Sequence, residues 1–546
     1  MDYGSYIKTP QNTPQTEALP GREAEMLPNA AGGVGFDTGP WGQLQRFLIL
    51  GSEGGTYYAS QRDLTMDNIS CVGECLKLNG QRVVDMAVEV STSGRALKND
   101  PAIFTLVLAL QHKGKGYSDG RDTEAVKVRR AASEAVPKVC RTGTHLFTFA
   151  QYLKGFGGWN RVTKGAFQKW YLGKSEADLA YQLIKYQQRG GWSHRDVLRR
   201  ARIAPDTDTR NALFHWAVKG WEDVGPKPHE DEVLRRVWAF ETAKRATNAS
   251  EVVDLIQTYN LPRECIPTEL LNSTEVWEAL LEKMPLGAMI RNLGKMSKLG
   301  MLDNMSDNTK FVVSRITDSE ALRRARIHPI NVLAALKTYS QGRGFRGSNT
   351  WDVTPKIVDA LDDAFYAAFE NVTPTGKRIC LALDVSGSMG QPVNGLEMLT
   401  NYEASAAMAM CIMRTEENWE AMAFSEGFQP LNISPKQRLD DVLKVMSRLS
   451  FSRTDCSVPF RWARTNGKRF DAFAVMTDSE TYHSGAHPSV ELANYRKQTG
   501  IPARSAVLAF TSTRTTIADP QDPGMLDIVG CDAQVPQLFN QFISGF

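Results

Sequence analysis

The stretch LALDVSGSMG (residues 381–390) runs an apolar segment directly into an aspartate, two serines and two glycines. A short apolar run that ends in a loop is typical of a buried strand. The oxygen-bearing side chains of Asp384, Ser386 and Ser388 stand at alternate positions, so a looping backbone can turn all three toward one point. The stretch therefore predicts a buried strand that ends in a cluster of oxygen ligands.

Similar short apolar runs recur through the C-terminal third. ICLAL (379–383) is followed by EAMAF (420–424), FAVMT (473–477) and SAVLAF (505–510), and helical segments such as 396–414 and 434–449 lie between them. This alternation is typical of a parallel sheet with helices on both faces. We predict a separate α/β domain over residues 371–546, joined to the rest of the chain near residues 374–376.

Two more oxygen ligands occur near later runs, Thr454 in SFSRTDCS and Asp478 at the end of FAVMTD. Open α/β sheets bind ligands beyond the carboxyl ends of their strands, where both would join Asp384, Ser386 and Ser388. Two carboxylates and three hydroxyls suit an octahedral Mg²⁺, or Mn²⁺, that keeps some water. We expect the hydroxyls to bind directly and the carboxylates partly through water. The alternative is that Asp384 and the serines only cap the next helix.

Residues 41–370 show apolar side chains at intervals of three and four, as in THLFTFAQYL (144–153) and NVLAALKTY (331–339), which indicates helices. The hexapeptide LRRARI occurs at 198–203 and again at 322–327, each time with proline two residues later. We predict an α-helical solenoid of stacked pairs, with a compact bundle as the alternative.

Residues 1–40 are rich in Pro, Gly, Thr and Gln and lack the apolar core of a signal peptide, so we predict a flexible arm. The chain has no apolar run of about eighteen residues, and we expect no membrane span. Its eight scattered cysteines are typical of reduced thiols, which favours a cytoplasmic protein.

Positive charge is concentrated in one region. The whole chain carries +3, but residues 141–220 hold fourteen Lys and Arg against five Asp and Glu, whereas residues 371–546 hold sixteen against eighteen. Such a field suits a polyanion, and Tyr186 and Trp192 add rings that can stack on unpaired bases. A solvated basic helix face is the alternative. The predicted RNA contacts in this region are Lys164, Lys169, Lys185, Arg189, His194, Arg195, Arg199, Arg200 and Arg202.

No arrangement of nucleophile and base stands out. Gly173, Lys174 and Ser175 look like the end of a phosphate-binding loop, but Gln168 occupies the place of its first glycine. We therefore predict that the protein is not an enzyme. A metal-dependent nuclease at the oxygen cluster is the competing idea, but hydroxyl ligands offer no evident general base.

Two groups of sequence motifs resemble known protein families. DVSGSM (384–389), Thr454 and TDSE (477–480) resemble the metal-ion-dependent adhesion site of von Willebrand factor A domains, whose ion is completed by an acidic group from a partner. Family members often have two glycines before the threonine, where this chain has Ser452 and Arg453. Arg453 would then weaken ion binding or add a contact to an acidic ligand.

Further sequence motifs resemble those of the Ro (TROVE-module) family, and its bacterial members more than its animal ones. They occur in the family's order from about residue 40 to the C-terminus, and they include GSEGGTYY (51–58), CRTGTHLFTF (140–149), RGGWSHRDVLR (189–199), MPLGAMIRNLGKM (284–296) and PTGKR (374–378).

The Ro resemblance implies a closed, monomeric ring of HEAT-like helical repeats sealed by a Rossmann-like A domain. It also implies Y RNA on the outer basic surface, single-stranded ends of misfolded RNA in the central hole, and a tether to an exoribonuclease. Arg291 and Lys295 stand four apart on one helix and would either project into that hole or lie along a packed surface. The alternative function is an adaptor that recruits an acidic protein ligand through the ion, with RNA binding secondary.

Overall fold

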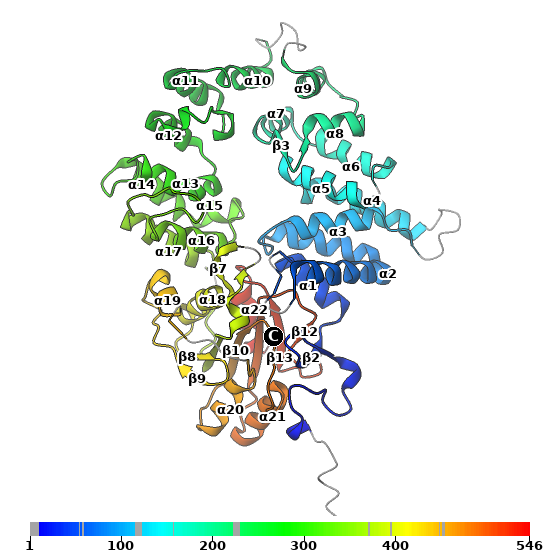
Figure 1. Ribbon diagram of the computed structural model, residues 1–546, viewed down its shortest axis with the longest axis vertical. Helices are drawn as coiled ribbons and strands as arrows, with labels where there is room; N and C mark the ends of the chain where they lie inside the picture. Colours follow the sequence, from blue (N-terminus) through cyan, green and yellow to red (C-terminus); the bar gives the residue numbers. More distant parts are fainter. Residues whose placement is uncertain are drawn as a thin grey trace, which may run out of the picture.

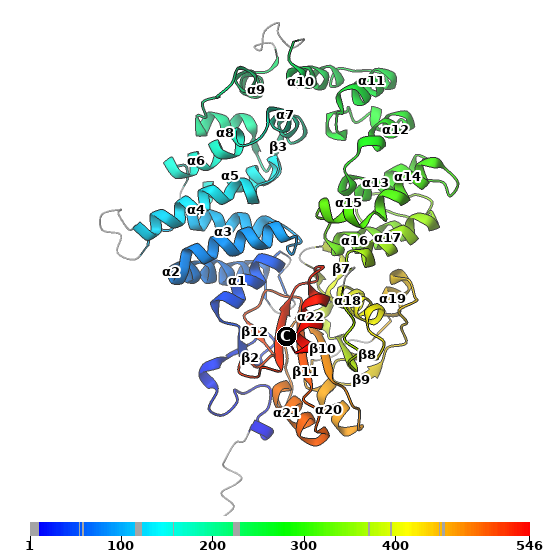
Figure 2. The same cartoon turned by 180° about the vertical axis from the view of Figure 1, so that it is seen from behind.

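The computed structural model describes residues 10–53, 55–56, 59–114, 123–156, 158–221, 230–369, 372–393, 396–446, 448–449 and 454–545. Helices follow a curved path that starts and ends on a sheet domain, as both views show (Figure 1, Figure 2). The helical part consists of α1 (Gly39–Leu50), α2 (Gln61–Ser93), α3 (Asp100–Leu110), α4 (Thr123–Val139), α5 (Gly143–Gly155), α6 (Arg161–Leu172), α7 (Glu176–Lys185), α8 (His194–Ala201), α9 (Asp208–Lys219), α10 (Glu232–Ala243), α11 (Ala249–Tyr259), α12 (Thr274–Lys283), α13 (Leu286–Lys298), α14 (Asp307–Ile316), α15 (Ser319–Arg324), α16 (Pro329–Ser340) and α17 (Pro355–Ala367).

Side-chain caps set where successive helices begin. Thr142, Asn160, Ser175, Ser193 and Thr207 precede α5 to α9, and each accepts a hydrogen bond from a backbone N–H of the first turn. Such caps satisfy donors that the helix itself leaves free. A short hairpin of β3 (Gln188–Arg189) and β4 (Trp192–Ser193) separates α7 from α8.

The two LRRARI copies have the same local structure. Arg202 follows α8 with a φ of 55°, and Arg326 follows α15 with a φ of 51°. A left-handed residue after the helix turns the chain at the same point in both copies. The repeat therefore marks equivalent helix ends. The helices follow a curved path in both views, so the compact-bundle alternative is wrong.

Both ends of the helical part meet at the sheet domain and close the ring. Arg95, just after α2, pairs with Asp532 (Nε to Oδ2, 3.2 Å), and its carbonyl lies 3.3 Å from His328 Nε2 at the start of α16. Lys337 of α16 donates to both carboxylate oxygens of Glu403 at 2.6 and 2.7 Å. These contacts are buried or half-buried, so the closure is part of the core.

The C-terminal domain has the predicted parallel sheet with helices on both faces. The strand order is β13-β11-β10-β5-β8-β9, and only β9 runs antiparallel to its neighbour. Ile379, Leu381 and Leu383 of β5 join the core that contains α18 and α22, whereas Cys380 and Ala382 join the core with α20 and α21. The elements are β5 (Ile379–Asp384), β6 (Pro392–Val393), β7 (Leu396–Thr400), α18 (Asn401–Thr415), β8 (Trp419–Phe424), β9 (Phe428–Pro430), α19 (Leu439–Met446), α20 (Val458–Thr465), β10 (Ala472–Thr477), α21 (Pro488–Thr499), β11 (Arg504–Ala509), β12 (Thr515–Thr516), β13 (Met525–Val529) and α22 (Val535–Ser544).

Two predicted helices start too early. The segment predicted as helical from residue 434 becomes helix α19 only at Leu439. Residues 396–400 form strand β7, and α18 begins only at Asn401. Thr400 and Glu403 form a capping box in which each side chain bonds the other's backbone N–H. That box fixes the helix start, and the periodicity of the preceding residues could not reveal it.

The predicted flexible arm is wrong for residues 10–40. This stretch contains η2 (Pro10–Asn12), η3 (Glu23–Glu25), β1 (Met26–Pro28) and β2 (Val34–Asp37), and β2 pairs with β12. Leu19, Met26 and Phe36 form a small core of their own. The segment is ordered because a strand almost 480 residues away completes its sheet, which composition cannot reveal. Residues 1–9 lie outside the described part.

All eight cysteines are buried and free of disulfides. Within the described ranges, no helix is both long and apolar enough to cross a membrane.

Candidate functional sites

The predicted oxygen ligands gather at the carboxyl edge of the sheet. Asp384 ends β5, and its Oδ1 accepts the Ser386 N–H (2.8 Å) while its Oδ2 accepts the Thr477 hydroxyl (2.6 Å). The hydroxyls of Ser386 and Ser388 lie 3.1 Å apart. The Tyr482 N–H donates to the Thr454 carbonyl (3.1 Å), which ties the loop of Thr454 to the loop that follows Asp478. We call Asp384, Ser386, Ser388, Thr454 and Asp478 the ion cluster; none of them is more than 2% exposed.

The electrostatics of the ion cluster fit a bound cation. Burial and the Asp478 carboxylate raise the pKa of Asp384 to about 7, and burial also raises the pKa of Asp478. Two buried carboxylates without a counter-ion cannot both ionise cheaply. The Thr454 hydroxyl is buried and has no hydrogen-bond partner among the described residues, so its oxygen is free to bind a cation.

The donor set indicates which kind of cation fits. No three His, Cys, Asp or Glu side chains gather as a metal site within the described ranges, so a cation here would take hydroxyl and water ligands besides the two carboxylates. Magnesium accepts such a set, whereas zinc prefers nitrogen and sulfur. Ser452 and Arg453, the predicted departure from the A-domain pattern, lie outside the described residues.

Sequence reasoning missed two carboxylates beside the cluster. Glu480 is 1% exposed, and burial and Asp478 raise its pKa to about 8. Asp455 is fully buried but has a lowered pKa, because bonds from Ser457, Gln15 and Arg461 outweigh its burial. The signal was present, since each carboxylate follows a predicted ligand within two residues.

A second candidate site lies on the outer side of the ring, where both views place α6 and α8 (Figure 1, Figure 2). A hollow of about 470 Å³ is lined by Lys154, Trp159, Lys164, Arg199, Arg200 and Arg202, among others. Smaller hollows of about 300 and 320 Å³ adjoin it, the first sharing Lys154 and Arg200, the second sharing Arg199 and Arg202 and adding His215. We call the three together the outer basic groove.

Aromatic rings support the floor of this groove. Trp159 stacks on Phe167 at 4.4 Å between centroids and lies 5.7 Å from Trp192, whose ring carries the Arg200 guanidinium at 5.3 Å. Trp192 is only 5% exposed, so it holds Arg200 in place and is not free to stack on bases as predicted. Trp159, which sequence reasoning missed, is half-buried and lines the groove.

The predicted RNA contact of His194 is wrong. Its side chain is 3% exposed, packs against Phe147 and Trp170, and lies 2.7 Å from the Tyr171 hydroxyl through Nδ1. Burial lowers the pKa of His194 to about 3, so the ring stays neutral. The spacing foretold this, because His194 shares a helix face with the buried Val197, Leu198 and Ala201.

Other predicted contacts lie away from the groove. Arg195 is exposed on α8 but does not line these hollows. Lys169 turns to α4, with Nζ 3.4 Å from the Ser133 hydroxyl and 3.9 Å from Glu134. Arg189 is exposed in β3, which lies with α7 on the inner side of the ring in both views.

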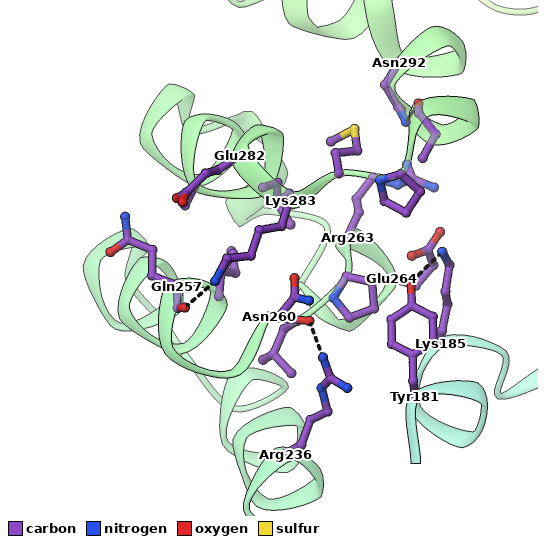
Figure 3. A pocket seen from close by; sticks show the side chains of 18 of the residues that line it. Tyr181, Lys185, Arg236, Gln257, Asn260, Arg263, Glu264, Glu282, Lys283 and Asn292 are labelled. Atoms are coloured by element: carbon purple, nitrogen blue, oxygen red, sulfur yellow. Dashed lines mark hydrogen bonds between the residues drawn. The ribbon is translucent and has the colours of Figure 1, made fainter. Parts of the chain in front are cut away.

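Lys185 belongs to an inner cavity of about 320 Å³ between α7 and α10 to α13, shown in Figure 3. Its Nζ donates to the Tyr181 hydroxyl (3.0 Å), and Arg236 and Lys283 donate to the carbonyls of Asn260 (3.4 Å) and Gln257 (3.3 Å). The basic residues of the region 141–220, here called the basic window, therefore lie on two faces of the ring, not one.

The two predicted contacts on α13 differ in their surroundings. Arg291 is exposed, and its charge partly offsets the burial that raises the pKa of Tyr186. Lys295 is half-buried and donates to Asn272 Oδ1 (2.9 Å), while partial burial and Lys298 lower its pKa. Arg291 thus lies near Tyr186 at the end of α7, whereas Lys295 is engaged by a neighbouring turn.

A closed helical ring sealed by a von Willebrand A domain defines a class of ring proteins, and comparisons with known proteins agree. Residues 27–338 match the TROVE domain family, and residues 378–543 match the Ro60 vWA domain. The chain is 38% identical to the Deinococcus radiodurans "RNA-binding protein RO60" over 98% of both chains. It is 36% identical to the Caenorhabditis elegans protein of the same name, covering 95% of this chain and 90% of that one.

A solved structure extends the agreement to three dimensions. The crystal structure of the Deinococcus radiodurans RO (RSR) protein matches 92% of this chain and 99% of its own with a TM-score of 0.69 and 37% identity. This chain belongs to the TROVE-domain Ro60 family, which confirms the resemblance noted in the sequence.

Proposed function

We propose that this protein is a non-enzymatic RNA-binding ring. It binds a small structured RNA of the Y class in the outer basic groove and accepts single-stranded ends of misfolded RNA at the centre of the ring. In this role it serves cytoplasmic RNA quality control, or it tethers an exoribonuclease to its substrate. The names of its relatives support the RNA part, and the outer basic groove is the observation that carries it.

The groove has the properties that RNA backbone binding needs. Arg199, Arg200 and Arg202 are exposed within one turn of chain, and Lys154 and Lys164 reach the same hollow from α5 and the start of α6. Several cations from three elements can contact successive phosphates, and each contact releases counterions. Trp159 lines the same hollow, with its ring stacked on Phe167.

The inner cavity supports the single-strand part. Lys185 and Arg236 lie over the Tyr181 ring at 5.2 and 5.5 Å, and Arg263 and Lys283 also line the cavity, together with Asp178, Glu264 and Glu282. Such a mixture suits unpaired nucleotides, whose phosphates and bases are both reachable.

We propose also that the ion cluster holds a divalent cation, Mg²⁺ or Mn²⁺. The free Thr454 hydroxyl and the raised pKa values of Asp384 and Asp478 support it. The adaptor function would require an outside carboxylate to reach that cation, and an exposure of at most 2% at every ligand does not favour it.

Salt titration of RNA binding tests the main proposal. Purified protein is titrated with a structured RNA of Y-RNA size and with a single-stranded RNA at several salt concentrations. Arg199→Ala and Arg200→Ala should each flatten the log–log slope for the structured RNA by about one unit, because each phosphate contact releases about one counterion. If affinity for both RNAs equals that of a neutral control protein, the proposed function is wrong.

A further inference from the structure

The N-terminal segment (residues 10–37) contacts the two loops that carry Thr454 and Asp478. Gln15 is fully buried, and its side chain lies between these loops. Its Nε2 donates to Asp455 Oδ1 (2.8 Å), one residue after Thr454, and its Oε1 accepts the hydroxyl of Thr481, three residues after Asp478. One amide group therefore bridges both ligand-bearing loops.

The rest of the segment holds the second loop along its length. Asn29 Nδ2 donates to the Thr481 carbonyl (2.7 Å), and the Ala31 N–H donates to Glu480 Oε2 (3.1 Å). Gly33 packs so closely that a Cβ there would collide with the Thr481 carbonyl oxygen. The Gln15 backbone N–H lies 3.1 Å from the carbonyls of both His483 and Gly485.

These contacts differ from those that merely attach the segment to the domain. Arg22 pairs with Asp519 (2.8 Å), and Phe36 packs in the small N-terminal core, both away from the ligand loops. The buried polar atoms of Gln15 instead bond Asp455 and Thr481, which lie beside the proposed ion ligands. Attachment alone does not require such a bridge.

We propose that the N-terminal segment is a working part of the cation site, with Gln15 as the residue that positions Thr454 and Asp478. This rests on the proposed cation site. Without the bridge, the two loops keep the Tyr482–Thr454 hydrogen bond but lose the buried amide between Asp455 and Thr481. The hydroxyl and the carboxylate are then held less firmly in the geometry that the cation needs. The segment, not a partner protein, then sets how tightly the ion is held.

Cation affinity of the full-length protein tests the proposal, with Mn²⁺ as the probe and free Mn²⁺ measured by electron paramagnetic resonance. Gln15→Ala should weaken Mn²⁺ binding about tenfold, since second-layer partners of metal ligands contribute 10- to 100-fold. Asn29→Ala, a milder change, should weaken it about threefold. The control Arg22→Ala loosens the same segment at its other attachment and should stay within twofold.

Melting temperatures in chelator separate positioning from general stability. If Gln15→Ala and Arg22→Ala lower the metal-free melting temperature equally but only Gln15→Ala weakens Mn²⁺ binding, the inference is supported. Equal Mn²⁺ affinity in Gln15→Ala, Asn29→Ala and unaltered protein would overturn it while leaving the cation site intact. If the unaltered protein binds no Mn²⁺, the cation site and this inference both fall, and the RNA proposal stands.

Discussion

The outer basic groove and the ion cluster both gather like charges, but the protein surrounds them differently. Arg199, Arg200 and Arg202 lie exposed on a helix end, whereas Asp384 and Asp478 are at most 1% exposed at the ends of strands. Water screens the arginines, so their repulsion costs little and their field extends to a polyanion. The carboxylates have lost that water, so burial disfavours their ionised form. Exposed positive charge therefore suits a large polyanion, whereas a buried pair of carboxylates suits a small cation.

The largest expected effect is the contribution of the ion cluster to the pH dependence of the protein's stability. The folded-state pKa of Asp384 is about 7, above its usual 3.8. Between these two pH values the folded protein therefore binds more protons than the unfolded chain. Without cation, stability should therefore fall as pH rises from about 4 to 7, by on the order of 4 kcal/mol from this group. Saturating Mg²⁺ should remove that fall. Thermal melting across this pH range, with Mg²⁺ and with chelator, checks it.

Buried histidines act in the opposite direction and need to be separated. Burial lowers the pKa of His194 to about 3 and of His328 to about 4, so they add stability as pH rises toward their usual 6.5. Because Mg²⁺ does not touch them, the difference between the two melting profiles isolates the ion cluster. Profiles that coincide would rule out a cation in the cluster.

A somewhat smaller effect is expected from charge reversal in the groove. Arg199→Glu with Arg200→Glu removes two phosphate contacts and adds repulsion, so affinity for structured RNA should fall about a hundredfold at low salt. The loss should shrink as salt rises, since both residues are exposed. Filter binding at two salt concentrations measures it. Asp384→Asn is the matched control for the ion cluster, and a similar loss there would abolish the distinction between the two regions.

The strands and most helices could be predicted, because burial periodicity is a local property of the sequence. The runs at 379–383, 420–424, 473–477 and 505–510 all proved to be strands within a residue of the predicted ends. The predicted oxygen cluster lies at the carboxyl edge of the sheet, because parallel strands bring their carboxyl ends to one edge, and its binding of an ion stays a prediction. What failed depended on distant contacts. Gln15 gains its role from Asp455 and Thr481, and no pattern within residues 1–40 records that.

His194 marks the same limit beneath the surface of α8. His194→Ala should destabilise the protein by about 2 kcal/mol, because it leaves a cavity among Phe147, Trp170 and Tyr171. Affinity for RNA, measured per folded molecule, should stay unchanged. Urea unfolding and RNA titration on one preparation test both statements. A loss of RNA affinity without a loss of stability would mean that His194 contacts RNA after all.

The smallest effect separates two lysines of one helix. Lys164 lines the outer basic groove, whereas Lys169, five residues along α6, turns to Ser133 and Glu134. Lys164→Glu should weaken binding of structured RNA about tenfold, and Lys169→Glu should change it by less than twofold, although the two variants have the same net charge. A difference between them therefore reports position and not the overall field of the protein. Equal losses in titrations at fixed salt would mean that the whole basic window, and not the groove, attracts the RNA.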